Sequence, residues 1–196
     1  IIIEGWENHP EGRKLELAAY DSMSIKPGSI VDNRKLNQDL NAIYASGWFS
    51  GVKIKSQDGS LGVRLIVSVV PNPILKKVEL KSINAVISNA DLDEIFKNSY
   101  GKTLNLNEFQ NKIEKIKKRY ENEGYSLARV NGPERISKDG IIRINVSEGI
   151  VSDVEFRFPG SDGESFVNGE PRKGKTKDWV IKRELKTQPG TIFNRK

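Results

Sequence analysis

The sequence predicts an α+β fold made of tandem modules in the order β-α-α-β-β, each with a three-stranded mixed sheet covered by two helices. Three observations lead to this fold class. One turn motif recurs three times, apolar residues at helical spacing follow its first two copies, and a run of alternating apolar and polar residues closes each of those two units. The turn motif occupies residues 27–32, 101–105 and 189–194.

A strand and a short helix are expected to open each module. Extended apolar runs predict strands at residues 1–4, 77–83 and 151–158. Helical stretches follow them at residues 13–22, 91–98 and 176–186.

A second, amphipathic helix is expected after the turn motif. Asp32 and Asn105 stand where a side chain accepts the unpaired backbone N–H groups of a helix N-terminus. The apolar residues that follow have the i, i+4, i+7 spacing of a buried helix face: Leu36, Leu40 and Ile43 in the first unit, and Phe109, Ile113, Ile116 and Tyr120 in the second. Gly47 and Gly124 are expected to end these helices.

A β-hairpin is expected to complete each of the first two modules. Its first strands are predicted at residues 48–55 and 125–130, and its turns at residues 57–59 and 133–140. Alternation in the last strand places one set of residues on the core face, namely Val63, Leu65, Val67 and Val69 in the first unit and Gly140, Ile142, Ile144 and Val146 in the second.

These elements divide the chain into residues 1–72, 73–148 and 149–196, with the third module ending after its first helix. Pro71 and Pro73 predict a stiff first joint, and Gly149 predicts more freedom at the second. The third module alone carries a long glycine-rich stretch, residues 159–175, and long loops of this kind are either functional or disordered.

The composition is that of an ordinary folded protein, with 36% hydrophobic and 30% charged residues. The chain begins at Ile1, which predicts a mature segment whose signal peptide has been removed. Its apolar runs are far shorter than the ~20 residues of a transmembrane helix. The net charge of +6 gives only a mild attraction to nucleic acid, anionic lipid or acidic polypeptide.

Catalytic chemistry has little support in the sequence. There is no cysteine, and His9 is the only histidine, which excludes thiolate metal sites and leaves no histidine cluster. We therefore expect no enzyme activity, no metal and no cofactor. Residues 169–176 satisfy the phosphate-binding pattern G-x-x-x-x-G-K-[ST], but no buried apolar strand precedes them, so nucleotide binding is not expected.

A KH-like nucleic-acid-binding module is the alternative from another functional class. Its element order and a positive net charge would suit this chain, but KH domains clamp RNA with a GXXG loop. Residues 28–31 and 101–104 lack the second glycine and carry apolar residues where phosphate would bind.

Four segments carry a resemblance to a known family: residues 40–50 (LNAIYASGWFS), 69–73 (VVPNP), 100–106 (YGKTLNL) and 191–195 (TIFNR). With three phased copies of the turn motif, they resemble the polypeptide-transport-associated (POTRA) domains of the outer-membrane β-barrel assembly proteins (BamA family), in particular the three-POTRA region of the cyanobacterial and plastid branch. The resemblance covers essentially the whole chain.

The resemblance implies a location at the outer membrane, on the periplasmic side in a bacterium, or at the plastid outer envelope. It implies that the chain holds unfolded outer-membrane or translocated polypeptides and passes them to its own C-terminal β-barrel, with accessory assembly factors as further partners. It also places the last module beside the barrel mouth, where residues 159–175 would contact or cover the pore.

Polypeptide binding is expected at the strand between the second helix and the hairpin turn, because this strand should lie at a sheet edge and could pair with an incoming extended chain. The candidate residues are Val52, Lys53, Ile54, Lys55, Ser126, Leu127, Ala128 and Arg129. Edge lysines that block aggregation are the alternative for Lys53 and Lys55. Trp48 and Phe49 are candidates for a client pocket, with core or inter-domain packing as the alternative.

Overall fold

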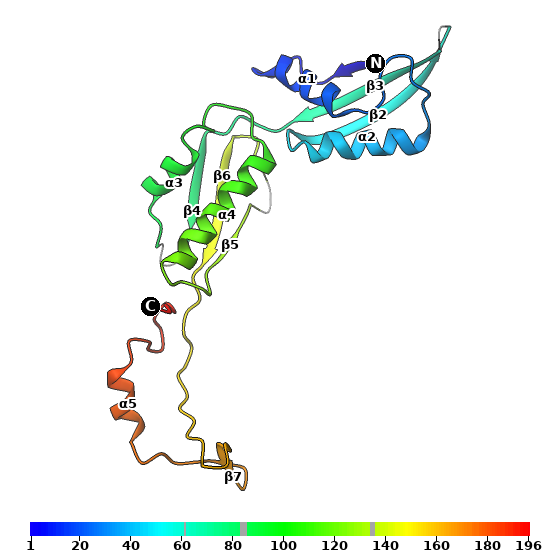
Figure 1. Cartoon of the computed structure of the whole chain (residues 1–196). Coiled ribbons are helices and arrows are strands. Elements are labelled where there is room, and N and C mark those ends of the chain that lie inside the picture. Colours follow the sequence, from blue (N-terminus) through cyan, green and yellow to red (C-terminus); the bar gives the residue numbers. More distant parts are fainter. Residues whose placement is uncertain (61, 83–85, 134–135) are drawn as a thin grey trace.

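Two three-stranded sheets, each covered by helices on one face, follow one another along an elongated and bent molecule, and a more open segment completes the chain (Figure 1). The structure is a computed structural model, and it describes residues 1–60, 62–82, 86–133 and 136–196. The predicted α+β architecture of tandem modules is confirmed.

The first module contains β1 (Ile2–Glu4), α1 (Gly12–Ser22), α2 (Asn33–Ala45), β2 (Phe49–Gly59) and β3 (Gly62–Pro71). The sheet order is β1-β3-β2, with β1 parallel and β2 antiparallel to β3. Helices and sheet enclose an apolar core whose buried members are Leu15, Ala19, Met23, Ile43, Phe49, Val52, Val67 and Val69.

The second module repeats this plan with β4 (Lys77–Lys81), α3 (Asn89–Phe96), α4 (Leu106–Asn122), β5 (Arg129–Asn131) and β6 (Ile141–Ser147). Its sheet order is β4-β6-β5, again with one parallel and one antiparallel pair. The buried face of α4 consists of the four residues that helical spacing predicted, Phe109, Ile113, Ile116 and Tyr120.

The turn motif caps both long helices as predicted. The Asp32 carboxylate accepts the backbone N–H of Lys35, and the Asn105 side-chain oxygen accepts those of Asn107 and Glu108. A buried carboxylate fixes the preceding loop in the first module, because Asp39 accepts the N–H groups of Ser24 and Ile25.

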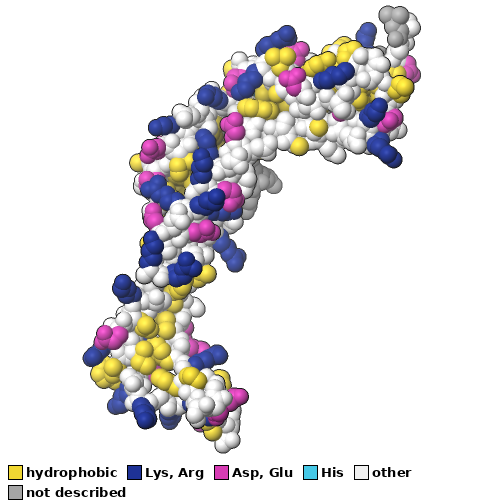
Figure 2. Space-filling view, in the orientation of Figure 1, with side chains coloured by type: hydrophobic (Ala, Val, Ile, Leu, Met, Phe, Trp, Pro, Cys, Tyr) yellow, Lys and Arg dark blue, Asp and Glu magenta, His cyan; other side chains and the backbone are white. Residues whose placement is uncertain are grey.

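The segment after Glu148 does not form a third sheet of this kind. The strand predicted at residues 151–158 is wrong: the backbone there forms no strand, because the described residues offer it no ladder partner. The segment holds a short hairpin, β7 (Phe166–Val167) with β8 (Glu170–Pro171), and one short helix, α5 (Asp178–Glu184). Apolar side chains gather on its surface (Figure 2), among them Ile150 and Trp179.

Three smaller expectations also need correction. The turn predicted at residues 57–59 is strand, since β2 continues to Gly59 and pairs with β3 as far as Gly62. Val63 is half exposed, because it lies near the far end of the hairpin rather than in the core. Of the strand predicted at residues 77–83, β4 covers residues 77–81, while residue 83 and part of the turn predicted at residues 133–140 lie outside the described residues.

No helix in the described part of the chain is long and apolar enough to cross a membrane. Nor do the described residues contain a cluster of three or more His, Cys, Asp or Glu side chains able to hold a metal ion.

Candidate polypeptide-binding site

The strand β2 is an edge of the first sheet, since it pairs with β3 on one side and no described strand pairs with it on the other. Val52, Lys53, Ile54 and Lys55 lie in its middle, opposite residues 66–69 of β3. The side chains alternate in exposure: Val52 is buried in the core and Ile54 packs against it, while Lys53 and Lys55 are exposed.

The direction of the backbone groups divides these four residues into two pairs. The Val52 N–H donates to the Tyr44 hydroxyl at 3.1 Å, so it points away from β3. In an antiparallel pair, successive residues direct their N–H and C=O groups alternately toward the neighbour and away from it. The backbone N–H and C=O groups of Val52, Ile54 and Ser56 therefore point toward the open edge. Those of Lys53 and Lys55 point toward β3 and form the ladder with it.

Tyr44 was not among the predicted site residues. It comes from the last turn of α2 and is itself partly exposed. Its hydroxyl occupies the first outward N–H of the edge, so the stretch that a client can use without displacing it begins at Ile54. No sequence pattern showed this, because the contact depends on how α2 packs against β2.

The second module offers a much shorter edge than expected. Only Arg129 of the predicted residues lies in β5, while Ser126, Leu127 and Ala128 lie in a turn before it. Two backbone hydrogen bonds hold this turn, from the Ser126 N–H to the Gly124 carbonyl and from the Ala128 N–H to the Tyr125 carbonyl. In the sheet, Val130 holds the place of Val52, since each is buried opposite a core valine of the neighbouring strand.

Trp48 and Phe49 have different surroundings. Phe49 is buried in the core of the first module. Trp48 is partly buried, its ring lies 4.3 Å from the Lys14 ammonium, and its carbonyl accepts the Asn72 N–H across the strand end. Trp48 therefore lies at the first joint between modules.

The first joint, between the first and second modules, is built around the C-terminus of α2. Gly47 has φ +80°, and its carbonyl accepts the Leu106 N–H at 2.9 Å, while the Asn105 amide donates to the Ser46 carbonyl. The buried Asn72 amide donates to the Gly47 and Leu104 carbonyls, and so it holds the linker to both modules.

A carboxylate adds to the first joint. Glu11 of the first module accepts both the backbone N–H and the hydroxyl of Thr103 in the second. Burial opposes its ionisation, but these hydrogen bonds and the nearby Lys14 ammonium hold the pKa of Glu11 below its ordinary value.

The second joint, between the second module and the last segment, repeats the central part of this arrangement. The Asn194 amide donates to the Glu123 carbonyl at 3.0 Å, and the Arg195 N–H donates to the Gly124 carbonyl at 2.9 Å. Asn194 and Gly124 thus take the places of Asn105 and Gly47. Glu148 occupies the position of Asn72, but its carboxylate lies within the second module, beside the hydroxyls of Ser82 and Tyr120.

Comparison with known proteins places this geometry in a family. A family model described as "POTRA domain, ShlB-type" matches residues 74–149. The solved N-terminal domain of Omp85 from the thermophilic cyanobacterium Thermosynechococcus elongatus is 39% identical, with a TM-score of 0.81 over 99% of this chain and 77% of that one. POTRA1-3 of the periplasmic domain of Omp85 from Anabaena is 36% identical, with a TM-score of 0.84 and the same coverage.

Two plant proteins named "Outer envelope protein 80, chloroplastic" are also similar. The one from Oryza sativa subsp. japonica is 27% identical over 100% of this chain, and the one from Arabidopsis thaliana is 28% identical over 94%. The chain spans 28% and 24% of the length of these curated relatives. The Omp85 POTRA domains are a non-enzymatic family. With identity above one third across almost the whole chain to the two cyanobacterial domains, the chain belongs to the POTRA-domain region of the Omp85 family, in its cyanobacterial and plastid branch.

Proposed function

We propose that this POTRA region holds unfolded polypeptide by adding it as a strand to the edge of β2. The observation that carries the proposal is the row of outward backbone groups on Ile54 and Ser56, which face the open edge in the described structure. Main-chain pairing depends little on client sequence, so one edge serves many clients.

The same proposal assigns the chain to an outer-membrane assembly or protein-translocation protein, on the periplasmic side of a bacterial outer membrane or at a plastid outer envelope. The words "periplasmic domain" and "outer envelope" in the names of its relatives support this, as does a 24% match over 108 residues to the outer membrane protein assembly factor BamA of Nitratidesulfovibrio vulgaris. Its partners are then unfolded outer-membrane or translocated polypeptides, the membrane part of the full-length protein and accessory assembly factors.

The expected binding is weak and rapidly reversible. About four net backbone hydrogen bonds at ~1 kcal/mol each amount to ~4 kcal/mol, which corresponds to a dissociation constant near millimolar. The second module adds little by the same mechanism, because β5 has only three residues. The first module is therefore the main binding site in this proposal.

A proline scan of the outward positions tests the edge directly. Unfolded outer-membrane peptides are titrated into isotopically labelled protein, and amide shifts are followed along β2. Ser56→Pro removes an outward N–H and leaves the ladder with β3 intact, so binding should weaken about fivefold, the equivalent of one hydrogen bond. Ser56→Ala keeps the N–H and should bind as the parent does.

Tyr44→Phe should change client affinity in the opposite direction to Ser56→Pro. It frees the Val52 N–H for the client, so affinity should rise and the shifts should extend to Val52. Peptides that shift no β2 amide in any variant, together with shifts on adding RNA, would overturn the proposal and favour the nucleic-acid alternative.

A further inference from the structure

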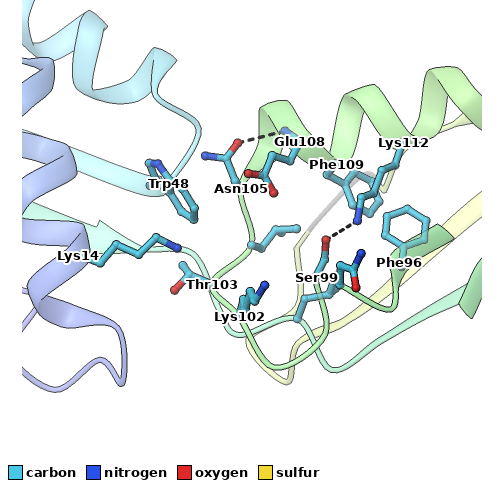
Figure 3. Close-up of a pocket in the computed structure, with 13 residues that line it drawn as sticks. Lys14, Trp48, Phe96, Ser99, Lys102, Thr103, Asn105, Glu108, Phe109 and Lys112 are labelled. Atoms are coloured by element: carbon cyan, nitrogen blue, oxygen red, sulfur yellow. Dashed lines mark hydrogen bonds between the residues drawn. The ribbon is translucent and has the colours of Figure 1, made fainter. Parts of the chain in front are cut away.

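A cavity of about 150 Å³ lies in the crease at the first joint (Figure 3). Trp48 and Lys14 reach it from the first module, and Phe96, Phe109, Lys102 and Lys112 reach it from the second. Neither module alone forms it, and two of its lining residues, Thr103 and Asn105, also make hydrogen bonds of the first joint.

Part of the cavity wall is apolar, and the rest of the wall is polar or charged. Phe96 and Phe109 are buried in the core of the second module with ring centroids 5.3 Å apart, and the partly buried Trp48 lines the cavity from the other module. A volume of about 150 Å³ is large enough for one benzene ring, and the apolar part of the lining (Trp48, Leu75, Phe96, Leu104 and Phe109) offers such a ring contacts beside the polar side chains. One aromatic or branched aliphatic side chain is therefore the largest group that fits.

The charges around the cavity are mostly positive. Three of the lining side chains are lysines, and Glu108 is the only acidic one. Lys14 pairs with Glu11 at 3.3 Å, whereas the ammonium group of Lys102 has no ion pair among the described residues. The site thus has one cationic group free for a ligand.

Lys112 is a second lysine of the cavity that makes no ion pair among the described residues. Its ammonium donates to the Ser99 hydroxyl and lies 5.1 Å from the centre of the Phe96 ring, both of them uncharged partners. Burial lowers the pKa of Lys112, the Glu108 carboxylate acts against this, and Lys115 and Lys102 reinforce it. A carboxylate of a ligand beside Lys112 would compensate for the hydration that its ammonium has lost, and it would favour the charged form of Lys112.

We propose that the crease cavity binds an apolar side chain together with an adjacent carboxylate of a client polypeptide, with Lys102 and Lys112 as the carboxylate partners. That the ligand is a polypeptide rests on the proposed function. Trp48 directly precedes β2 and lies six residues before Ile54, so an extended client of about six residues, or ~20 Å, reaches from the edge to the cavity. The cavity adds the side-chain selectivity that backbone pairing lacks.

Two matched peptides test the carboxylate requirement. Ac-Gly-Phe-Asp-Gly-NH2 and Ac-Gly-Phe-Asn-Gly-NH2 differ only in charge, and each is titrated into the full chain while the amides of Ser99, Lys102 and Thr103 are followed by NMR. Charged hydrogen bonds exceed neutral ones enough to favour the Asp peptide about fivefold. Equal binding of the two peptides, or no shift at these amides, would overturn the proposal.

Substitutions then assign the preference to the cavity. Lys102→Ala and Lys112→Gln should each reduce the preference for Asp, and the double variant should abolish it. Lys118→Ala removes the same charge from an exposed position on α4 and should leave the preference unchanged. If Lys112→Gln perturbs the fold, the exposed Lys102 still provides the test. Loss of the preference in Lys118→Ala as well would mean general charge attraction and would refute the assignment.

The β2 amides in the same spectra separate this proposal from the previous one. Shifts at the cavity amides without shifts at the β2 amides would support binding at the cavity and refute binding at the edge. Shifts at the β2 amides that are equal for the two peptides, with no shift at the cavity amides, would support binding at the edge and refute binding at the cavity.

Discussion

The two joints of the molecule share one device but differ in how many contacts support it. In each, an asparagine amide donates to a carbonyl at the end of the preceding helix, and the next backbone N–H donates to the carbonyl of a left-handed glycine. The first joint adds the buried Asn72 amide, the Glu11 carboxylate and a bond from the Asn107 amide to the Ala45 carbonyl.

The difference shows that the pair of hydrogen bonds shared by the joints and the additional rigidity of the first joint depend on different residues. The device depends on a glycine at the helix end and an asparagine at the next helix cap, and both belong to the repeat. The additional contacts come from residues whose counterparts cannot make them, since Ile192 stands where Thr103 does and Glu148 where Asn72 does. We therefore expect the first joint to be the stiffer one, and for reasons beyond its two prolines.

The largest effect is expected from Asn72→Leu. Its side chain is fully buried, and losing it leaves the Leu104 carbonyl without its partner, which costs about 2 kcal/mol. The first module should unfold at lower denaturant concentration, and the first joint should become as loose as the second. Spin labels at Asn41→Cys and Glu121→Cys, possible because the chain has no other cysteine, report the breadth of the inter-module distance distribution.

Glu148→Gln is the matched control for Asn72→Leu, since it changes the corresponding residue of the second module. It should lower the stability of that module and leave the breadth of both joints unchanged. A first joint that stays narrow in Asn72→Leu would show that the device alone sets its rigidity.

A smaller, pH-dependent effect is expected from Glu11→Gln, about 1 kcal/mol at neutral pH. The pKa of Glu11 is lower in the folded protein than in the unfolded chain, so its contribution is complete above the ordinary glutamate range and is lost as the pH falls through the lowered value. The parent's first joint should therefore loosen on acidification, while the variant is already loose at pH 7 and changes less. The same spin-label pair measures both.

Asp39 needs separate attention in that experiment. Burial opposes its ionisation, but hydrogen bonds from Ser24 and Ile25 hold the pKa of Asp39 low as well, so the first module as a whole loses stability in acid. A joint that loosens only when the module unfolds, at the same pH in parent and variant, would contradict the role assigned to Glu11.

The smallest effects are expected from removing the shared asparagines. Asn105→Ala removes the cap of α4 as well as the joint bond and should cost about 1 kcal/mol in the second module. Asn194→Ala removes a joint bond and, in the described chain, no helix cap, so denaturation should barely change while the second joint broadens. Labels at Glu121→Cys and Lys186→Cys report that joint, and equal costs for the two substitutions would contradict the comparison.

Much of the fold could be predicted because each module repeats a local pattern. The Asp32 and Asn105 caps, the α4 face and the core face of β6 all follow from spacing along the chain. Ser126–Ala128 were misplaced because the strand was predicted to begin directly after Gly124, whereas a hydrogen-bonded turn occupies these residues and β5 begins only at Arg129. The strand at residues 151–158 failed because a strand needs a partner, which periodicity does not reveal.

The site was less predictable than the fold. That β2 lies at an edge follows from the order of elements, but the direction of each N–H does not, and Tyr44 contacts Val52 only through tertiary packing. The joint bonds and the crease cavity join residues far apart in sequence through backbone carbonyls, which have no sequence signature. Lys102 and Lys112 could have been noted only as parts of a charged surface.

The repeated device also determines a symmetry. When successive units are joined by equivalent bonds at equivalent atoms, the same rotation and translation carry each unit onto the next, and repeating that operation generates a screw rather than a straight line. Figure 1 shows the bend between the first two modules, which is the one step of such an operation that the two sheets define. Each further module would turn its sheet edge by a constant angle, so a client in contact with several modules would have to wind around the axis.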